Sequence, residues 1–243
     1  MAHRPGKFRL MSLALIALLP SFLKRGCYRA FFGYKIGKRV KIGVSILDAS
    51  ICSIDDNTQI GHLNVVIGVE RLTIGDHTKI GHLNIFRGGD EITLGRYCEI
   101  IRLNEINSIP DPLVVNPIDP RFILGNGSIV TTGHKIDFTD KVEIGTRTII
   151  GGRNSSIWTH NRQRTRGVNI GSYAYIGSEI RVAPGGGLPS RCIVGIGTVI
   201  TKPIETENCM IAGVPAKVVK MLSDDDLFLV EQKTRPDLPD EIV

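Results

Sequence analysis

Two histidines are the residues of this chain best suited to acid–base chemistry. The segment that begins at His134 (HKIDFTDKVEIGTRTIIG) and the segment that begins at His160 (HNRQRTRGVNIGSYAYIG) match at seven of eighteen positions without a gap. An imidazole changes its protonation state near neutral pH, so it can take the proton of a hydroxyl group that attacks another molecule. The repeat predicts that the two rings lie one structural repeat apart on the same edge, about 5 Å from each other. The inert alternative for each is a solvent-facing histidine in a ladder of repeats.

The elements that must carry these histidines follow from two repeat lengths. Ile60 to Lys79 and Ile80 to Glu99 are identical at eight of twenty positions. Further along, aliphatic residues fall six apart, and glycine often follows them. These aliphatic residues are Ile170, Ile176, Val182, Leu188, Val194 and Ile200. A helix repeats every 3.6 residues and a flat strand every two, so neither explains a period of six.

A coil of three short strands accounts for both repeats. Each strand takes about six residues and turns one aliphatic side chain inward, and successive coils pair as parallel strands about 4.8 Å apart. The sequence therefore predicts an all-β fold: a short helical segment over 1–35, a parallel β-helix over 36–213, and a short C-terminal helix with an acidic tail over 214–243. Four prolines interrupt the period and predict a loop insertion over 105–121.

The last hexads carry a resemblance to a known family. Between Val168 and Lys217, tandem Ile-Gly pairs lead to Val199-Ile200-Thr201-Lys202 and then to Ala212-Gly213-Val214-Pro215-Ala216-Lys217. This segment resembles the end of bacterial sugar O-acetyltransferases, which belong to the hexapeptide-repeat acyltransferases and fold as a left-handed parallel β-helix. The resemblance implies the left hand, a homotrimer with active sites between subunits, and acyl transfer from acetyl-CoA or another acyl-CoA to a carbohydrate hydroxyl. Such enzymes serve surface-polysaccharide or lipid-linked glycan biosynthesis.

The resemblance also assigns roles to residues. The family uses one histidine that precedes the final hexads, and His160 matches that place. His134 competes with it, because His134 and Asp137 fit another family form, His-x-aliphatic-Asp. Trp158 and Asn161 flank His160 and, with Asp137, are expected to bind the carbohydrate. The positions implied for the acyl-CoA, where glycine permits close approach and lysine meets phosphate, are Gly177, Ser178, Gly195, Gly197, Lys202 and Lys217.

Three other histidines raise a metal-dependent alternative. His77 and His82 resemble the paired zinc ligands of the γ-class carbonic anhydrases, which share the fold. The third ligand should lie about two coils upstream, but His62 is only fifteen residues before His77. A ladder of repeated polar corner residues explains these histidines better, and no metal is expected. A γ-carbonic-anhydrase-like zinc enzyme and a non-catalytic β-helix scaffold are the alternative functions.

The formal charge of +6 is concentrated at the N-terminus. The first 41 residues hold ten lysines and arginines and no acid, so the rest of the chain sums to about −4. This distribution argues against a nucleic-acid-binding face and fits an anionic membrane surface. Leu10 to Leu23 is uncharged but shorter than the roughly 20 residues of a membrane span, and Lys24 and Arg25 stand where a signal peptide would be cleaved. We expect residues 1–32 to contact a membrane, to cap the main domain, or both.

Composition sets the remaining expectations. Hydrophobic residues at 42% and charged residues at 22% exclude a disordered chain. The five cysteines form no C-x-x-C pair and are odd in number, which is typical of a reducing compartment. The expected location is the cytoplasm, with peripheral attachment to the inner face of the plasma membrane if the N-terminal segment binds lipid.

Overall fold

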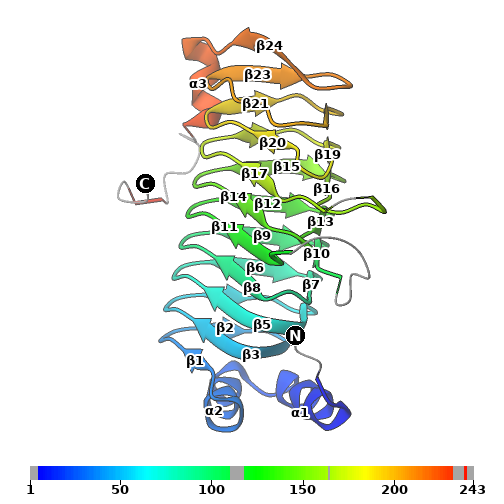
Figure 1. The fold of residues 1–243 in the computed structure, drawn as a ribbon. Coiled ribbons are helices and arrows are strands. Elements are labelled where there is room, and N and C mark those ends of the chain that lie inside the picture. The colour runs from blue at the N-terminus through cyan, green and yellow to red at the C-terminus, as the bar shows by residue number, and fades with distance from the viewer. Residues whose placement is uncertain (1–4, 110–117, 164, 232–237, 240–243) are drawn as a thin grey trace.

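The computed structural model describes residues 5–109, 118–163, 165–231 and 238–239. The chain winds into a column of stacked coils (Figure 1), and the aliphatic residues of the repeats are buried inside it. Ile144, Ile170 and Ile176 are at most 1% exposed, and Ile60 and Ile80 are buried as well. The predicted parallel β-solenoid is therefore confirmed. Burial of each such side chain contributes about 1.5–3 kcal/mol to the stability of the column.

Most coils contribute one strand to each of three faces. The first face contains β1 (Lys35–Ile36), β8 (Glu91–Leu94), β11 (Arg121–Leu124), β14 (Val142–Ile144), β17 (Val168–Ile170) and β20 (Gly187–Leu188). The second face contains β2 (Lys41–Ile42), β4 (Gln59–Ile60), β6 (Lys79–His82), β9 (Glu99–Arg102), β12 (Ile129–Thr132), β15 (Ile149–Arg153), β18 (Tyr175–Ile176), β21 (Cys192–Val194) and β23 (Cys209–Ala212). The third face contains β7 (Ile85–Arg87), β10 (Glu105–Asn107), β13 (Lys135–Asp137), β16 (Ser156–Ile157), β19 (Arg181–Val182) and β22 (Val199–Ile200).

Two long strands join the third face to the first. Strands β3 (Ile46–Ile54) and β5 (Val65–Ile74) run across the corner between them, so the two faces form one sheet. Neighbouring strands within each face pair in parallel, and the buried residues stack in register. On the first face, for example, Ile144 pairs with Ile170, which pairs in turn with Leu188. This register carries the aliphatic core along the whole column.

A ladder of buried asparagines holds the corner between the second and third faces. The backbone N–H of Asn84 donates to Oδ1 of Asn64 at 3.0 Å, and that of Asn104 donates to Oδ1 of Asn84 at 3.1 Å. Leu83 and Leu103 precede two of them with φ near +60°, which turns the chain sharply at this corner. Each asparagine thus satisfies a backbone donor that the turn leaves unpaired.

Two helices close the N-terminal end of the column (Figure 1), as the sequence predicts. They are α1 (Lys7–Ala17) and α2 (Ser21–Phe32). Lys24 of α2 is buried, and its Nζ donates to the carbonyl oxygens of Ile42, at 3.2 Å, and Gly43. Burial lowers the pKa of this ammonium group. In the described part of the chain, no helix is long and apolar enough to cross a membrane.

The C-terminal end departs from the coil pattern. Strand β24 (Lys217–Met221) turns back and pairs antiparallel with β23. Helix α3 (Asp224–Val230) follows, and Ser223 and Asp226 form a capping box at its start. The three aspartates of its first turn belong to the acidic tail seen in the sequence. Their negative charges interact favourably with the positive, N-terminal end of the helix dipole.

The loop insertion is shorter than the predicted 105–121. Glu105–Asn107 forms β10 and Arg121–Leu124 forms β11, so both ends of the predicted loop are strands of the solenoid. Pro120 comes directly before β11, whereas Pro110, Pro112 and Pro117 lie outside the described residues. The prolines do not locate the edges of the predicted loop, because the flanking strands are only three or four residues long.

Candidate active site

His160 and Asp137 form a hydrogen-bonded pair at the corner between the third and first faces. Nδ1 of His160 lies 2.7 Å from Oδ2 of Asp137. A carboxylate can only accept, so the imidazole hydrogen is on Nδ1 and the lone pair of the neutral ring is on Nε2. The His160 side chain is 27% exposed, whereas Asp137 is buried. The arrangement presents a basic nitrogen at the surface and fixes its orientation from below.

Asp137 is held in turn by its neighbours. Its Oδ2 also accepts from the backbone N–H and the hydroxyl of Thr159, at 2.9 and 2.8 Å. Its Oδ1 accepts from the hydroxyl of Thr139 at 2.7 Å. The sequence predicts that Asp137 binds the carbohydrate, and Asp137 does line the cavity described next. Both of its oxygens already accept hydrogen bonds within the chain, and one of these bonds fixes the orientation of the His160 ring.

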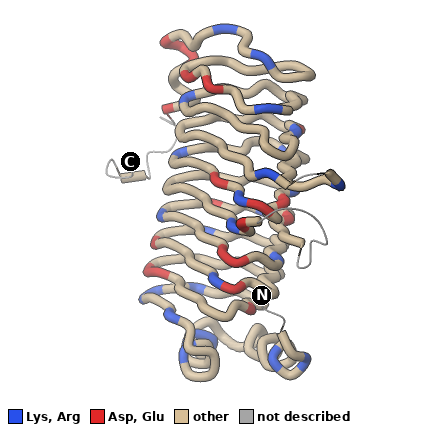
Figure 2. The backbone as a smooth tube through the Cα atoms, in the orientation of Figure 1, with Lys and Arg blue, Asp and Glu red and all other residues tan. Residues whose placement is uncertain are grey.

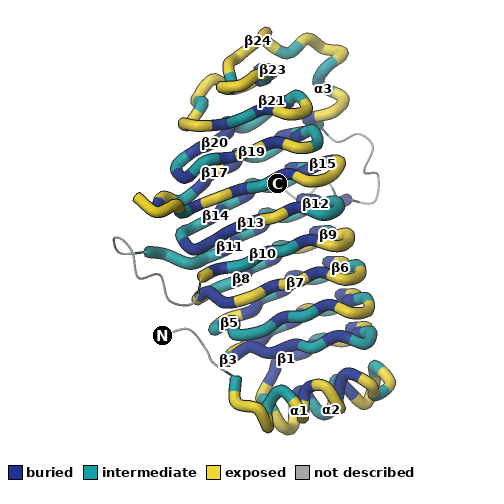
Figure 3. Tube along the Cα trace, turned by 90° about the vertical axis from the view of Figure 1, so that its right-hand side faces the viewer, coloured by how far each residue is buried: buried dark blue, intermediate teal, exposed yellow. Residues whose placement is uncertain are grey.

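A cavity of about 320 Å³ opens beside this pair on the third face. Strands β7, β10 and β13 lie next to one another on this face (Figure 3), and their last residues, Arg87, Asn107 and Asp137, stand in register on one row. Row neighbours are about 4.8 Å apart, so Arg87 lies roughly 10 Å from Asp137. Trp158 also lines the cavity and is 43% exposed. The cavity thus combines an imidazole, an aromatic ring, an amide and a cation.

Among the described residues that line this cavity, Asn107 has a side-chain acceptor without a hydrogen-bond partner. Its Oδ1 is buried and, among the described residues, has no hydrogen-bond partner. A buried acceptor without a partner is costly, on the order of 1–3 kcal/mol. Asn161, by contrast, lies in the hairpin after Trp158, where its Oδ1 accepts from the backbone of Gln163, and it is not part of the described wall of the cavity.

His134 lies at a different corner, between the second and third faces, and continues the asparagine ladder. Its backbone N–H donates to Oδ1 of Asn104 at 2.9 Å. Its Nδ1 accepts from the backbone N–H of Ser155 at 3.1 Å, and its Nε2 lies 2.9 Å from the hydroxyl of Thr131. Burial lowers the pKa of this imidazole to about 4. His134 is therefore neutral near pH 7. Its side chain is also buried, at 1% exposed, and both ring nitrogens have hydrogen-bond partners.

The prediction that the two rings share one edge is wrong, and the register gives the reason. Lys135 pairs with Ser156, so His134 stands opposite Ser155, an offset of 21 residues rather than 26. The missing residues lie in a small hairpin after β16, where His160 bridges Thr165. Beyond the hairpin Val142 pairs with Val168, which restores the offset of 26. The match in the sequence therefore aligns His134, a position of the asparagine ladder, with His160, a position of the hairpin.

The residues predicted for acyl-CoA lie at two corners of the column. Gly177 and Ser178 follow β18, and Gly195 and Gly197 follow β21, all at the corner between the second and third faces. Lys217 starts β24 beside the end of β23, at the same corner. Lys202, like His160, follows the third face, toward the first. Within one protomer the structure therefore does not bring the glycines and His160 together.

The fold gives its own reasons for two of these glycines. A Cβ on Gly177 would lie 3.0 Å from the carbonyl oxygen of Val194 in the next coil. Gly197 has φ of +71°, which side chains disfavour, but open space around it. Coil stacking and turn geometry thus account for both residues, and open space at Gly197 leaves that edge accessible to a ligand.

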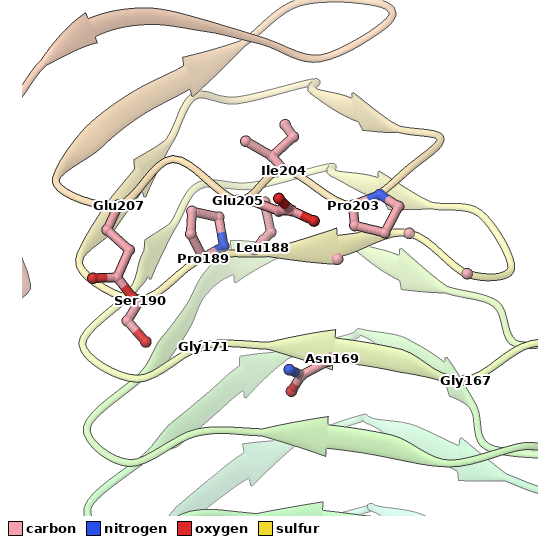
Figure 4. A pocket seen from close by; sticks show the side chains of 13 residues that line it. Gly167, Asn169, Gly171, Leu188, Pro189, Ser190, Pro203, Ile204, Glu205 and Glu207 are labelled. Carbon is pink, nitrogen blue, oxygen red and sulfur yellow. The ribbon is translucent and has the colours of Figure 1, made fainter.

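A second cavity of about 410 Å³ lies on the first face, beside the base of the His160 hairpin (Figure 4). Glycines make up much of its wall, and Asn169 and Ser190 line it as well. Glu205 and Glu207 are exposed there and make it acidic. Two carboxylates disfavour the phosphates of a coenzyme A at this place.

Three further histidines form surface stacks. His62 and His82 stack with ring centroids 5.7 Å apart, and His77 stacks on Tyr97 at 4.6 Å. His77 also contacts Asp76, with its Nδ1 2.8 Å from a carboxylate oxygen. In the described ranges of one protomer, no three side chains of His, Cys, Asp or Glu are grouped to hold a metal ion.

Sequence reasoning missed most of the cavity wall. It did not identify Arg87 or Asn107, because the two lie in different coils and neither belongs to a motif. The signal that could have found them is the register itself. The third residue of each short strand on the third face falls on one row, and that row ends at Asp137.

Comparisons with known proteins bear on the family. No family model matches the chain. A segment of 59 residues is 34% identical to galactoside O-acetyltransferase of Escherichia coli (strain K12), and it covers 24% of this chain and 29% of that protein. The chain thus matches less than a third of the length of this curated relative.

Solved structures similar to the chain include three acyltransferases. The polySia-specific acetyltransferase NeuO is 16% identical, with 78% of this chain and 83% of that chain covered and a TM-score of 0.40. The UDP-N-acetylglucosamine acyltransferase of Arabidopsis is 16% identical, with 82% and 73% covered and a TM-score of 0.43. A hexapeptide-repeat acetyltransferase of Vibrio cholerae, complexed with acetyl coenzyme A, is 14% identical, with 90% and 92% covered and a TM-score of 0.35.

The chain's own repeats and the curated relative agree with each other. Isoleucine–glycine hexads form the inward side of a parallel β-solenoid, and the matched relative is an acetyltransferase. In these two respects the chain is similar to hexapeptide-repeat acetyltransferases.

Proposed function

We propose that this protein is a cytoplasmic acetyl-CoA-dependent O-acetyltransferase that acts on a carbohydrate hydroxyl in surface-polysaccharide or lipid-linked glycan biosynthesis. The observation that carries the proposal is the buried Asp137, which orients the part-exposed His160 beside an open polar cavity. The match to galactoside O-acetyltransferase supports a sugar as the acceptor class. The five cysteines are all free, which is consistent with a reducing compartment.

His160 is the proposed general base. Its Nε2 accepts the proton of the acceptor hydroxyl, while Nδ1–H remains bonded to Asp137. Acetyl-CoA, when bound, supplies the thioester carbonyl carbon that the acceptor oxygen attacks. The bond to sulfur breaks, and the proton held by His160 passes to the departing thiolate. Asp137 stabilises the imidazolium between these two proton transfers.

The cavity wall supplies the proposed acceptor contacts. The exposed ring of Trp158 offers an apolar surface for a sugar ring, and Oδ1 of Asn107 accepts from a sugar hydroxyl. At the side of the cavity, Nζ of Lys135 lies 3.9 Å from Oε2 of Glu105, and the two charges largely offset each other. The Arg87 side chain adds a positive charge on the same wall.

The donor site is proposed to form between subunits of a homotrimer. The glycine corner with Lys217 and the corner with His160 are separate within one protomer, so a shared site requires a second copy. Closed threefold symmetry places unlike corners of a prism-shaped subunit against each other. Ser178, Gly195 and Gly197 of one subunit would then lie along the acyl-CoA that reaches His160 of the next. Lys202 and Lys217 are the proposed phosphate contacts.

Two experiments, first on acetyl-CoA binding and then on acetyl transfer, test this function. Calorimetry of the purified protein with acetyl-CoA should give saturable binding, and a panel of glycan acceptors should then yield free thiol and an acetylated product. Full-length protein that is folded but does not bind acetyl-CoA would contradict the proposal.

A mixing experiment tests the shared site. Trimers of His160→Gln and trimers of Lys217→Glu should each lose activity at low acetyl-CoA concentration. Hybrid trimers from co-expression should recover part of that activity, because some sites join an intact His160 to an intact Lys217. A site contained within one subunit predicts no recovery.

A further inference from the structure

An exposed apolar stripe runs along the outer side of α1 and continues onto α2. Phe8, Met11, Leu15 and Leu18 recur at helical spacing and are 62–86% exposed, and Phe22 at the start of α2 is 65% exposed. Leu13, Ile16 and Ala17 lie on the opposite side of α1 and are buried. At 3.6 residues per turn these two groups point in opposite directions. The helix is thus apolar toward the column and apolar toward solvent.

The stripe lies at one end of the molecule, where nothing in the described chain covers it. Figure 1 shows α1 and α2 beneath the first coils, with the remaining coils stacked away from them. The inner side of these helices packs on the column, as shown by buried Tyr28 and by Lys24 bonded to the first coil. The outer side therefore forms a terminal surface of the molecule.

The charge around this surface is of one sign. In Figure 2 the two helices carry lysine and arginine but no acidic residue, whereas the first acidic residues lie on the coils. Lys7, Lys35, Lys38, Arg39 and Lys41 are exposed. Asp48, the first acid in the sequence, is buried and paired with Arg9 at 2.6 Å. A basic rim around an apolar stripe complements anionic headgroups over acyl chains.

We propose that α1 and the start of α2 dock this protein on the surface of an anionic lipid bilayer, with the solenoid projecting away from it. Phe8, Met11, Leu15, Leu18 and Phe22 enter the headgroup region, and the basic rim contacts lipid phosphates and carboxylates. The helices lie in the interface and do not span it. A second copy of the chain would also cover an apolar stripe, but two basic rims would repel each other in such a pair.

Vesicle sedimentation with the full chain tests this proposal without any assay of activity. The protein should bind phosphatidylglycerol-containing vesicles more strongly than pure phosphatidylcholine vesicles, and high salt should weaken that binding. The variant Met11→Glu/Leu15→Glu/Leu18→Glu should reduce the bound fraction about tenfold or more, because it removes the inserted side chains and adds repelling charge.

A matched variant controls for added charge. Val219, Met221 and Phe228 are 48–62% exposed at the opposite end of the chain, and changing all three to Glu should leave vesicle binding close to that of the wild type. Circular dichroism and gel filtration of each variant report folding and assembly. A folded wild-type chain that ignores anionic vesicles overturns the proposal. So does a helix variant that binds vesicles normally but alters the number of subunits, which would assign the stripe to self-association.

Discussion

Asp137 and His160 come from neighbouring coils and meet through a 2.7 Å hydrogen bond between Oδ2 and Nδ1. Asp137 ends strand β13, whereas His160 lies in the hairpin that follows β16. The same carboxylate oxygen accepts from the backbone N–H of His160 at 3.2 Å. The His160 ring therefore lies on a loop, but a carboxylate at the end of a buried strand fixes its orientation.

The first prediction concerns Asp137→Asn. An amide at this position offers one acceptor atom where the carboxylate offers two, and it cannot neutralise an imidazolium. We expect kcat to fall by about 10²-fold or more, with little change in KM for acetyl-CoA. Steady-state kinetics at saturating acceptor measures this.

Thr139→Val is the matched control for that variant. It removes the 2.7 Å bond to Oδ1 and leaves the bonds at Oδ2 in place. Its kcat should stay within about tenfold of wild type. If Asp137→Asn were as active as Thr139→Val, the carboxylate would not position the base.

The second prediction concerns the pH dependence of stability. Burial holds the pKa of folded His134 at about 4, whereas an unfolded chain protonates its histidines near pH 6.5. The unfolded state therefore binds more protons between these values. His134 should contribute stability above pH 6.5 that is lost as the pH falls toward 4, by up to roughly 3 kcal/mol.

His134→Asn isolates this contribution. Asparagine occupies the equivalent ladder positions 64, 84 and 104, so the variant keeps a polar ladder without a titrating group. Urea unfolding at pH 7 and pH 4.5 should show a smaller loss of stability in the variant than in the wild type. Equal losses would mean that His134 does not titrate on unfolding.

The third prediction concerns the acceptor. Asn107→Ala removes the unpartnered Oδ1 from the cavity wall and should raise KM for the acceptor by about five- to tenfold, as expected for one lost hydrogen bond. KM for acetyl-CoA should not change. Asn169→Ala, an exposed asparagine on the first face, is the matched control. An unchanged acceptor KM in Asn107→Ala would remove this residue from the acceptor site.

The fold was predictable because its rule is local. A buried residue recurs every sixth position, as at Ile170 and Ile176, and each coil must bury it against the next. Strand edges were less predictable, as the ends of the 105–121 insertion show, because a strand of three residues leaves little pattern. The prediction of His160 as the base depends on its place before the last hexads.

The relation of His160 to its neighbours was not predictable in the same way. Asn104, His134 and Ser155 occupy successive positions of one corner, yet they share no side-chain type. Sequence identity therefore aligned His134 with His160, whereas the pairing of the strands places His134 opposite Ser155. The pairing of Asp137 with His160 depends on a hairpin whose length alters the register, and only the coordinates reveal it.

Acyl transfer by two single variants tests the central claim most directly. His160→Gln should lower kcat/KM for the acceptor by about 10²–10⁴-fold, because it removes the general base from the cavity. His134→Asn, measured at pH 7.5 where both proteins are folded, should retain activity within about tenfold of wild type, because His134 is buried in the ladder. Full activity in His160→Gln together with an inactive, folded His134→Asn would contradict the account.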